Sequence, residues 1–414
     1  MTQTISEMDI HNMRRRYGNS VRNLLDHQRI PQASKEKILR FLEHCQAQDL
    51  SLARRLFYLQ RLTIIAATLG RKSLPDADRA DLERILSEIS SRRGRSGQSL
   101  GAWTKRGYKI AARVFWRWLK GCQEGEDPSE TAWIKIKRTK DVKTLPEDLL
   151  TKDDVLRMLR VAEHPMHKAM LIVGHDLAGR PNEWFTMRLK DIEFDEYSAI
   201  VRVRGKNGTR RVRLVLATVS LRQWLELHPC RETSDAPLWV CLEGEHAGEA
   251  LGYDRARKLI QQLADKAGVK KHVNPYQFRH STITALATEL TEAEMCEIFG
   301  WTQGSRMPRV YVHLSGRDVD QKILRIHGVI KESQVEKRTL ERRKCQRCGT
   351  ENPPEGHFCT VCAAPLDART AFELERHREA ADEAMNMLIQ DAEVQKLLKR
   401  KLVELGLAEK LNTP

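Results

Sequence analysis

Four cysteines near the end of the chain have the types and spacing of a metal site. The stretch "CQRCGTENPPEGHFCTVCAAPL" contains two Cys-x-x-Cys pairs, made up of Cys345, Cys348, Cys359 and Cys362. Two such tight turns can direct four thiolates at one tetrahedral Zn²⁺, and no ligand position is then left for water. The spacing therefore predicts a structural zinc in preference to redox pairs or disulfides. Gly349 follows the first pair, where the turn requires a positive φ.

A strongly basic hairpin is the second candidate for chemistry. The stretch "SAIVRVRGKNGTRRVRLVL", Ser198 to Leu216, places Asn-Gly between two runs in which apolar and basic residues alternate. Alternation around Asn-Gly predicts a β-hairpin with a two-residue turn. Lys206 is expected at its tip, and Arg204 and Arg210 are expected to hold the ribbon against phosphates. The pattern thus predicts a lysine that a stiff ribbon presents to a polyanion.

Three further segments, taken in order with this hairpin, resemble the tyrosine recombinase (phage integrase) family. The segments are "LAGRPNEWFTMRLKDI", "NPYQFRHSTITAL" and "EIFGWTQGSRMPRVYVHLSGRDVD". The positions that match the family's boxes are Gly179, Arg180, Glu183, Lys206, Tyr276, Arg279, His280, Gly300, Trp301 and Tyr311. No single box is decisive, and the resemblance depends on their order and spacing over residues 150–325.

The resemblance implies cleavage of DNA through a 3′-phosphotyrosine, without ATP and without a catalytic metal. Arg180 and Arg279 are the expected clamp, because a guanidinium can bind the phosphate oxygens bidentately whereas a lysine cannot. Tyr311 is the expected nucleophile. Lys206 is expected to give a proton to the departing 5′ oxygen. The complete set of expected catalytic residues is Arg180, Lys206, Tyr276, Arg279, Trp301 and Tyr311.

Tyr276 departs from the histidine that the family usually has at this position. A histidine can exchange protons near neutral pH, whereas a phenol with an ordinary pKa of about 10 is a poor proton shuttle there. A phenol can still donate a hydrogen bond to the phosphate. Tyrosine or lysine also occurs at this position in the family, especially among archaeal members, so this departure is compatible with activity.

Each of these residues has a structural interpretation when it is taken alone. Arginines commonly form salt bridges, and Glu183 lies within one helical turn of Arg180. Tyr311 and Trp301 alone would be read as core residues. For His280 the alternative to catalysis is support of Arg279, and for His313 a packing role is expected. The family order favours the catalytic interpretation for the set.

Length and composition agree with a large DNA-associated protein. The 414 residues predict two or three domains, and the net charge of +15 favours a polyanionic partner. No apolar run approaches the length of about 18 residues that is needed to span a bilayer. The N-terminal stretch lacks an apolar signal core, so a cytoplasmic location is expected. Nine cysteines in such a chain argue against a disulfide framework.

The segment "AWTKRGYKIAARVFWRWLKG" combines an apolar and a basic stripe at helical spacing. The apolar face is expected to contain Ile110, Val114 and Trp118. The basic stripe contains Arg106, Lys109, Arg113, Arg117 and Lys120. A basic stripe is often only a solvated face, but the resemblance to the family's DNA-clamping domain favours DNA contact.

The predicted fold is mainly α and multidomain. Residues 1–141 are expected to form a helical core-binding (SAM-like) DNA-binding domain, and residues 147–333 a mostly α catalytic domain with a small antiparallel β-sheet. Thr151 is the expected N-cap of its first helix. Residues 345–366 resemble a zinc ribbon, and residues 368–414 a helical tail that either oligomerises or folds onto its own chain.

The predicted function is site-specific recombination of double-stranded DNA, carried out by four protomers on two duplexes. The Gly-Trp pair, the run "MPRVYVHLSGRDVD" and the ribbon resemble archaeal integrases, which favours a mobile-element integrase over a resolvase of chromosome dimers. One rival is a type IB topoisomerase, which would not need the tail. Another is a non-catalytic DNA-binding regulator descended from a recombinase, but the set Arg180, Lys206, Arg279 and Tyr311 favours an enzyme.

Overall fold

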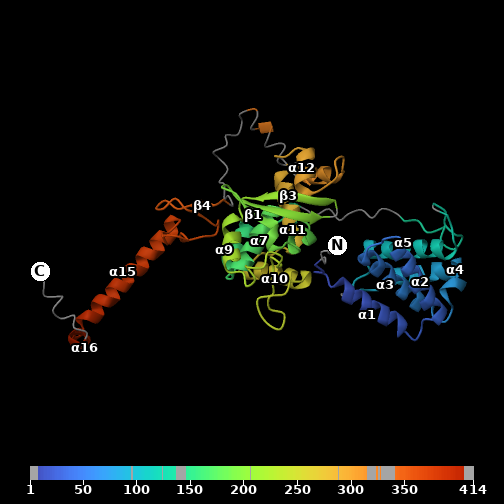
Figure 1. The fold of residues 1–414 in the computed structure, drawn as a ribbon, viewed down its shortest axis with the longest axis horizontal. Helices are drawn as coiled ribbons and strands as arrows, with labels where there is room; N and C mark the ends of the chain where they lie inside the picture. The colour runs from blue at the N-terminus through green and yellow to red at the C-terminus, as the bar shows by residue number, and fades with distance from the viewer. Residues whose placement is uncertain are drawn as a thin grey trace. The chain divides into compact units, whose positions relative to one another are not determined.

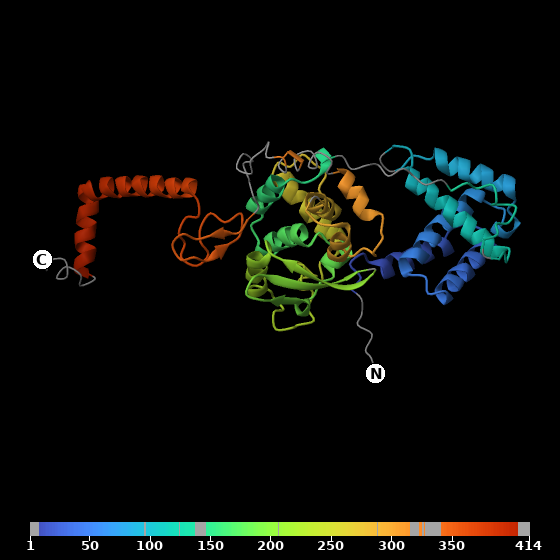
Figure 2. The same cartoon turned by 90° about the horizontal axis from the view of Figure 1, so that it is seen from above.

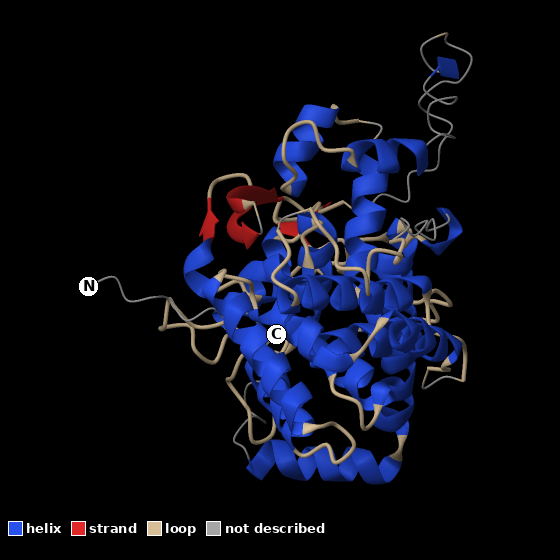
Figure 3. Cartoon of the chain, turned by 90° about the vertical axis from the view of Figure 1, so that its right-hand side faces the viewer, coloured by secondary structure: helices blue, strands red, loops and turns tan. Residues whose placement is uncertain are grey.

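The computed structural model confirms a mainly helical chain with small antiparallel sheets (Figure 3). It describes residues 8–94, 97–123, 125–136, 146–205, 207–287, 289–314, 323–324, 327 and 341–404. The chain divides into two compact units. One consists of Met1–Pro146 and Glu249–Ala256, and the other of Glu147–Gly248 and Arg257–Pro414.

The first unit is a bundle of helices around one apolar core (Figure 1). Its helices are α1 (Met13–Leu25), α2 (Gln32–Ala47), α3 (Leu52–Leu69), α4 (Arg79–Ser91) and α5 (Ala102–Leu119). Side-chain caps fix where α3 and α4 begin, because Ser51 accepts from the backbone N–H of Arg54 and Asp78 from that of Asp81. Phe41, Phe115 and Trp116 are fully buried at its centre.

Helix α5 buries a different stripe from the predicted one. Tyr108, Ala111, Ala112, Phe115 and Trp116 face the core, whereas Ile110, Val114 and Trp118 are only half-buried at its margin. Two adjacent apolar stripes satisfy helical spacing in this aromatic-rich segment. The stripe that packs is the wider of the two and contains three aromatic rings.

A short segment from the second half of the sequence also belongs to the first unit. The backbone N–H of Tyr253 donates to the carbonyl of Ile10 at 2.9 Å, and the rings of His11 and Tyr253 lie 4.8 Å apart. The sequence alone gave no indication of this pairing.

The second unit begins with the expected helix cap. Thr151 Oγ1 accepts from the N–H of Asp154, and the Asp154 carboxylate accepts from the N–H of Thr151, so the predicted N-cap of α6 is confirmed. The helices of this part are α6 (Lys152–Val161), α7 (Pro165–Leu177), α8 (Pro181–Phe185), α9 (Thr218–Glu226), α10 (Tyr253–Lys266), α11 (Pro275–Leu286), α12 (Glu292–Phe299) and α13 (Met307–Leu314). The first turn of α10, up to Ala256, is counted with the first unit.

A three-stranded antiparallel sheet accompanies these helices. Its strands are β1 (Ile192–Phe194), β2 (Ala199–Gly205) and β3 (Gly208–Leu214), in the order β1-β2-β3. The alternation predicted for the hairpin is confirmed, since Val201, Val203, Val212 and Leu214 are buried. Strand β2 ends at Gly205, which pairs with Gly208 at the start of β3.

The last described part contains a small sheet and two helices. Strands β4 (Arg343–Lys344) and β5 (Glu351–Asn352) pair antiparallel beside the cysteines. Helices α15 (Ala368–Gln390) and α16 (Ala392–Glu404) follow as two separate rods (Figure 2). Among the residues described, no helix has both the length and the apolar character needed to cross a membrane.

Candidate functional site

Arg279 is held almost completely buried on α11. The helix begins with Pro275 after an Asn274 cap, which fixes its start. The guanidinium donates to the carbonyl of Ala178 at 2.7 Å and to that of Phe299 at 2.9 Å, so it joins the ends of α7 and α12. It is 4% exposed, and burial, with the nearby charge of Arg180, lowers its pKa to about 10. The group therefore remains a cation at neutral pH.

Arg180 lies at the start of α8 and shares a buried carboxylate with the hairpin. Its Nη1 donates to Glu183 Oε1 at 2.8 Å, and Arg210 Nη2 donates to Glu183 Oε2 at 2.9 Å. Burial alone would raise the pKa of Glu183, but the hydrogen bonds and charges of Arg210 and Arg180 outweigh it and lower that pKa. Glu183 is thus an anion that positions two guanidiniums.

The strand register explains why Arg210 points inward. Arg210 has the same parity on β3 as Val212 and Leu214, which places all three on the buried face of the hairpin. Its Nε also donates to the carbonyl of Ile298 at 2.9 Å. Arg204 lies on the opposite, exposed face, so the structure separates two residues that we predicted as DNA contacts. This parity was already present in the sequence.

The hairpin turn is fastened to the loop after α12. Asn207 Nδ2 donates to the carbonyl of Gly300 at 3.0 Å, and Arg180 Nη2 donates to the same oxygen at 3.2 Å. Gly205 lies against Glu183, since a Cβ on it would meet Glu183 Oε1 at 2.3 Å. Lys206 lies outside the described residues; its neighbours Gly205 and Asn207 lie against Glu183 and the Gly300 carbonyl.

Tyr311, on α13, lies between the rings of Trp301 and His280, in a cluster that also contains Arg180 and Arg279. Its ring is stacked on Trp301 with centroids 5.6 Å apart and on His280 with centroids 5.8 Å apart. The Arg279 guanidinium lies 5.4 Å from the Trp301 ring centroid. Tyr311 is 2% exposed, and its hydroxyl is 2.9 Å from His280 Nδ1. Burial raises the pKa of Tyr311 despite the opposing charges of Arg279 and Arg180.

Tyr276 is placed at the edge of this cluster. It is 48% exposed, and its ring centroid lies 6.4 Å from that of His280, one helical turn further along α11. The cluster therefore contains the predicted residues Arg180, Tyr276, Arg279, Trp301 and Tyr311. The backbone of His313 belongs to α13, whereas its side chain is outside the described residues.

The basic residues predicted on α5 are largely paired within the first unit. Arg113 and Arg117 both bind Asp127, and Lys120 binds Glu130 at 2.7 Å. Arg106 lies over the Trp103 ring at 5.5 Å. Lys109 is half-buried. These pairs hold the segment after α5 in place, and phosphate contact by the stripe remains a prediction.

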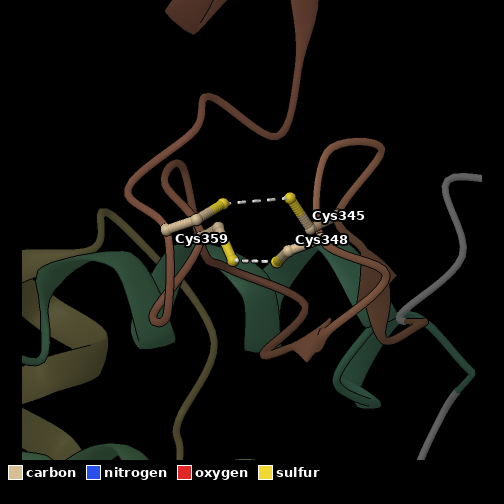
Figure 4. A group of neighbouring side chains, drawn as sticks. Cys345, Cys348 and Cys359 are labelled. Carbon is tan, nitrogen blue, oxygen red and sulfur yellow. Dashed lines mark hydrogen bonds between the residues drawn. The ribbon is translucent and has the colours of Figure 1, made fainter.

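The four cysteines converge as predicted and could hold a metal ion (Figure 4). Their sulfur atoms lie within 4.8 Å of one another, with Cys345 and Cys362 3.6 Å apart and Cys348 and Cys359 3.5 Å apart. These separations fit a tetrahedron of thiolates around a zinc at about 2.3 Å. Gly349 has the predicted positive φ, at 74°.

Comparison with known proteins identifies the family. Residues 148–317 match the model of the phage integrase family. Tyrosine recombinase XerC of Chromobacterium violaceum is 28% identical over 255 residues, which are 59% of this chain and 79% of that protein. Residues 148–317 therefore form a domain of the phage integrase (tyrosine recombinase) family. As a tyrosine recombinase it is an enzyme that breaks and rejoins DNA.

Two further comparisons cover different shares of the chain. Tyrosine recombinase XerA of Pyrococcus horikoshii is 27% identical over 150 residues, which are 36% of this chain and 50% of that protein. The crystal structure of the XerH site-specific recombinase bound to difH has a TM-score of 0.50 at 20% identity, and it covers 76% of this chain and 97% of that one. The latter likeness concerns the fold.

Proposed function

We propose that this recombinase cuts DNA at specific sites by attack of Tyr311 on a phosphodiester held by Arg180 and Arg279. The observation that supports this most is that Tyr311 and Arg279 both lie against the Trp301 ring, while Arg180 binds Glu183 and the carbonyl of Gly300. The charges of both arginines act on the phenol of Tyr311. A phosphate beside these guanidiniums would therefore lie close to the nucleophile.

In the proposed step, Tyr311 Oη forms a bond to phosphorus and the bond from phosphorus to the 5′ oxygen breaks. The 3′ end then remains on the enzyme as a phosphotyrosine, which conserves the bond for rejoining without ATP. Lys206 gives a proton to the departing 5′ oxygen. Arg180 and Arg279 stabilise the charge that develops on the non-bridging oxygens.

The near-complete burial of Tyr311 adds a requirement to this proposal. A side chain that is 2% exposed is not in contact with a duplex, so DNA has to move neighbouring groups before attack. Tyr276, at the exposed edge of the cluster, is suited to donate a hydrogen bond to the arriving phosphate. Cleavage would then depend on correct DNA binding.

Double-stranded DNA is the proposed partner, and four protomers the proposed assembly. The net charge of +15 supports a polyanionic partner. Apolar side chains exposed on the C-terminal helices support self-association; they include Leu374, Met385, Leu388 and Leu397. We further propose that the cysteines hold structural zinc and that the enzyme is the integrase of a mobile element.

The proposal is tested with nicked suicide substrates made from DNA that flanks the gene. The wild-type chain is expected to give a protein–DNA band that survives denaturation, whereas Tyr311→Phe should give none while retaining DNA binding. Tyr276→Phe should only slow capture. An adduct that persists in Tyr311→Phe would identify another nucleophile, and binding without any adduct in the wild type would favour the regulator.

A further inference from the structure

We propose that His280 Nδ1 is the acceptor of the Tyr311 proton during strand cleavage. Position 276, where the family usually has a histidine, is a tyrosine in this chain, so the proton needs another destination. The inference rests on the proposed function, because it assigns a residue to one step of that reaction.

The contact between the two side chains has the geometry that proton transfer requires. A general base must lie within about 2.6–3.2 Å of the atom that it deprotonates, and His280 Nδ1 lies 2.9 Å from Tyr311 Oη. The two rings are stacked at an interplanar angle of 27°. His280 is on α11 and Tyr311 on α13, so the contact joins two elements that pack against each other.

Burial makes a proton acceptor necessary for Tyr311 and keeps the His280 imidazole free to accept. Burial raises the pKa of Tyr311, so the phenol holds its proton at neutral pH. Burial, together with the neighbouring charge of Arg279, lowers the pKa of His280 below its ordinary 6.5. The imidazole is therefore neutral, and with its proton on Nε2 it accepts at Nδ1.

Tyr276 is less suited to the role in both chemistry and position. A neutral phenol is a much weaker proton acceptor than an imidazole. It is 48% exposed, and its ring centroid lies 6.4 Å from that of His280. Position 276 keeps a hydrogen-bond donor that can face a phosphate, and proton transfer passes to the histidine one turn later on the same helix.

The incoming phosphate would itself favour the transfer. In the DNA-free chain, the cation of Arg279 opposes a positive charge on His280. Arg180 adds a second cation beside Arg279, and Glu183 is the anion that partly balances it. A bound phosphodiester places negative charge between the guanidiniums, which stabilises an imidazolium nearby. The proton moves from Oη to Nδ1 as the P–Oη bond forms and the bond to the 5′ oxygen breaks. On rejoining, it returns from Nδ1 to Oη.

The test is single-turnover covalent capture by the full chain on the nicked suicide substrate. His280→Asn retains an oxygen that can accept the Tyr311 hydrogen bond but cannot take up the proton at neutral pH. Loss of a general base costs about 100-fold or more in rate, so this variant should capture DNA about 100-fold more slowly than the wild type. His272→Asn, at an exposed position, is the matched control and should capture normally.

Fluorinated tyrosine at position 311 separates proton transfer from positioning. Its phenol is a stronger acid, so its incorporation should restore most of the rate in His280→Asn and give little gain in the wild-type background. If fluorination changes both backgrounds by the same factor, His280 is not the acceptor. Normal or faster capture by His280→Asn would also overturn the inference, because His280 would then be neutral or an inhibitory contact.

A pH profile of the chain without a substitution at position 280 covers the case in which the variant does not fold. The capture rate should fall at low pH, below the ordinary histidine value of 6.5, as the imidazole becomes protonated. The pH at which the rate falls should not change when Tyr311 is fluorinated, because this fall reflects protonation of the imidazole. If this pH shifts together with the acidity of the phenol, the inference is overturned. A wild-type chain that forms no adduct at all would overturn the proposed function instead.

Discussion

Proton transfer to the 5′ oxygen is the step that we assign to Lys206, and a change of leaving group isolates it. Lys206→Ala should slow covalent capture by about 100-fold or more, the usual effect of losing a general acid. A substrate with sulfur at the 5′ bridging position needs no proton on its leaving group, so it should restore capture. The measurement is the capture rate on matched oxygen and sulfur substrates.

The control for this substitution is Lys190→Ala, because Lys190 is paired with Asp235 and has no assigned role in the reaction. It should leave capture on both substrates unchanged. If Lys206→Ala lowers the rate equally on oxygen and sulfur substrates, then Lys206 holds the DNA and is not the acid.

The proposed catalytic residues could be named from the sequence, but their partners mostly could not. Arg180, Arg279, Trp301 and Tyr311 were recognised through the order of the boxes, and the structure brings them together. The bond between Tyr311 and His280 depends on how α13 packs on α11, which no local pattern encodes. The position of Arg210, in contrast, could have been predicted from the sequence. It is two residues before Val212 on the same strand, so both side chains are on the buried face.

Among the elements, the buried carboxylate of Glu183 joins α8 to the hairpin, and its removal should be costly. Glu183→Gln leaves Arg210, which is largely buried, without its anion, and breaking such a pair from one side destabilises a protein by about 3–5 kcal/mol. We expect a loss of this order in the free energy of unfolding, measured by denaturant titration. Capture should fall as well, because Arg180 loses the same partner.

Glu193→Gln is the matched control for this loss. Glu193 binds Arg202 on the exposed face of the same sheet, where an ion pair contributes about 0–1 kcal/mol.

The pH dependence of stability provides a second check on the role of Glu183. The folded pKa of Glu183 is lowered, so its contribution is present above the ordinary 4.5 and is lost as the pH falls further. Glu183→Gln should therefore lose less stability on acidification than the wild type, and an equal loss would contradict the assignment.

The elements themselves were predicted well where the signal is local and poorly where it is not. The hairpin, the α6 cap and the cysteine turns follow from short patterns, and the structure has all three. The predicted apolar stripe of α5 lies only at the margin of the core, because aromatic residues occur on two adjacent faces of the helix. The return of residues 249–256 to the first unit depends on a contact between segments far apart in the sequence.

On the scale of the whole molecule, the catalytic cluster and the cysteine cluster use separate parts of the chain. The contacts of the catalytic cluster are made by residues 178–311, whereas the cysteines lie at positions 345–362. A structural zinc stabilises the residues around it by joining them and has no part in phosphoryl transfer. Metal removal should therefore affect the ribbon and leave single-turnover capture intact.

We expect elemental analysis to find one zinc per chain in the wild type and none in Cys345→Ser. Cys230→Ser, outside the cluster, should retain the metal. Without zinc, the β4–β5 pairing should be lost, and proteolysis should become faster at residues 341–367. Capture on the suicide substrate should stay within about twofold of the wild type, since no catalytic residue is a metal ligand. If zinc-free protein binds DNA normally but fails to form the adduct, the ribbon contributes to the catalytic site and this separation of roles is wrong.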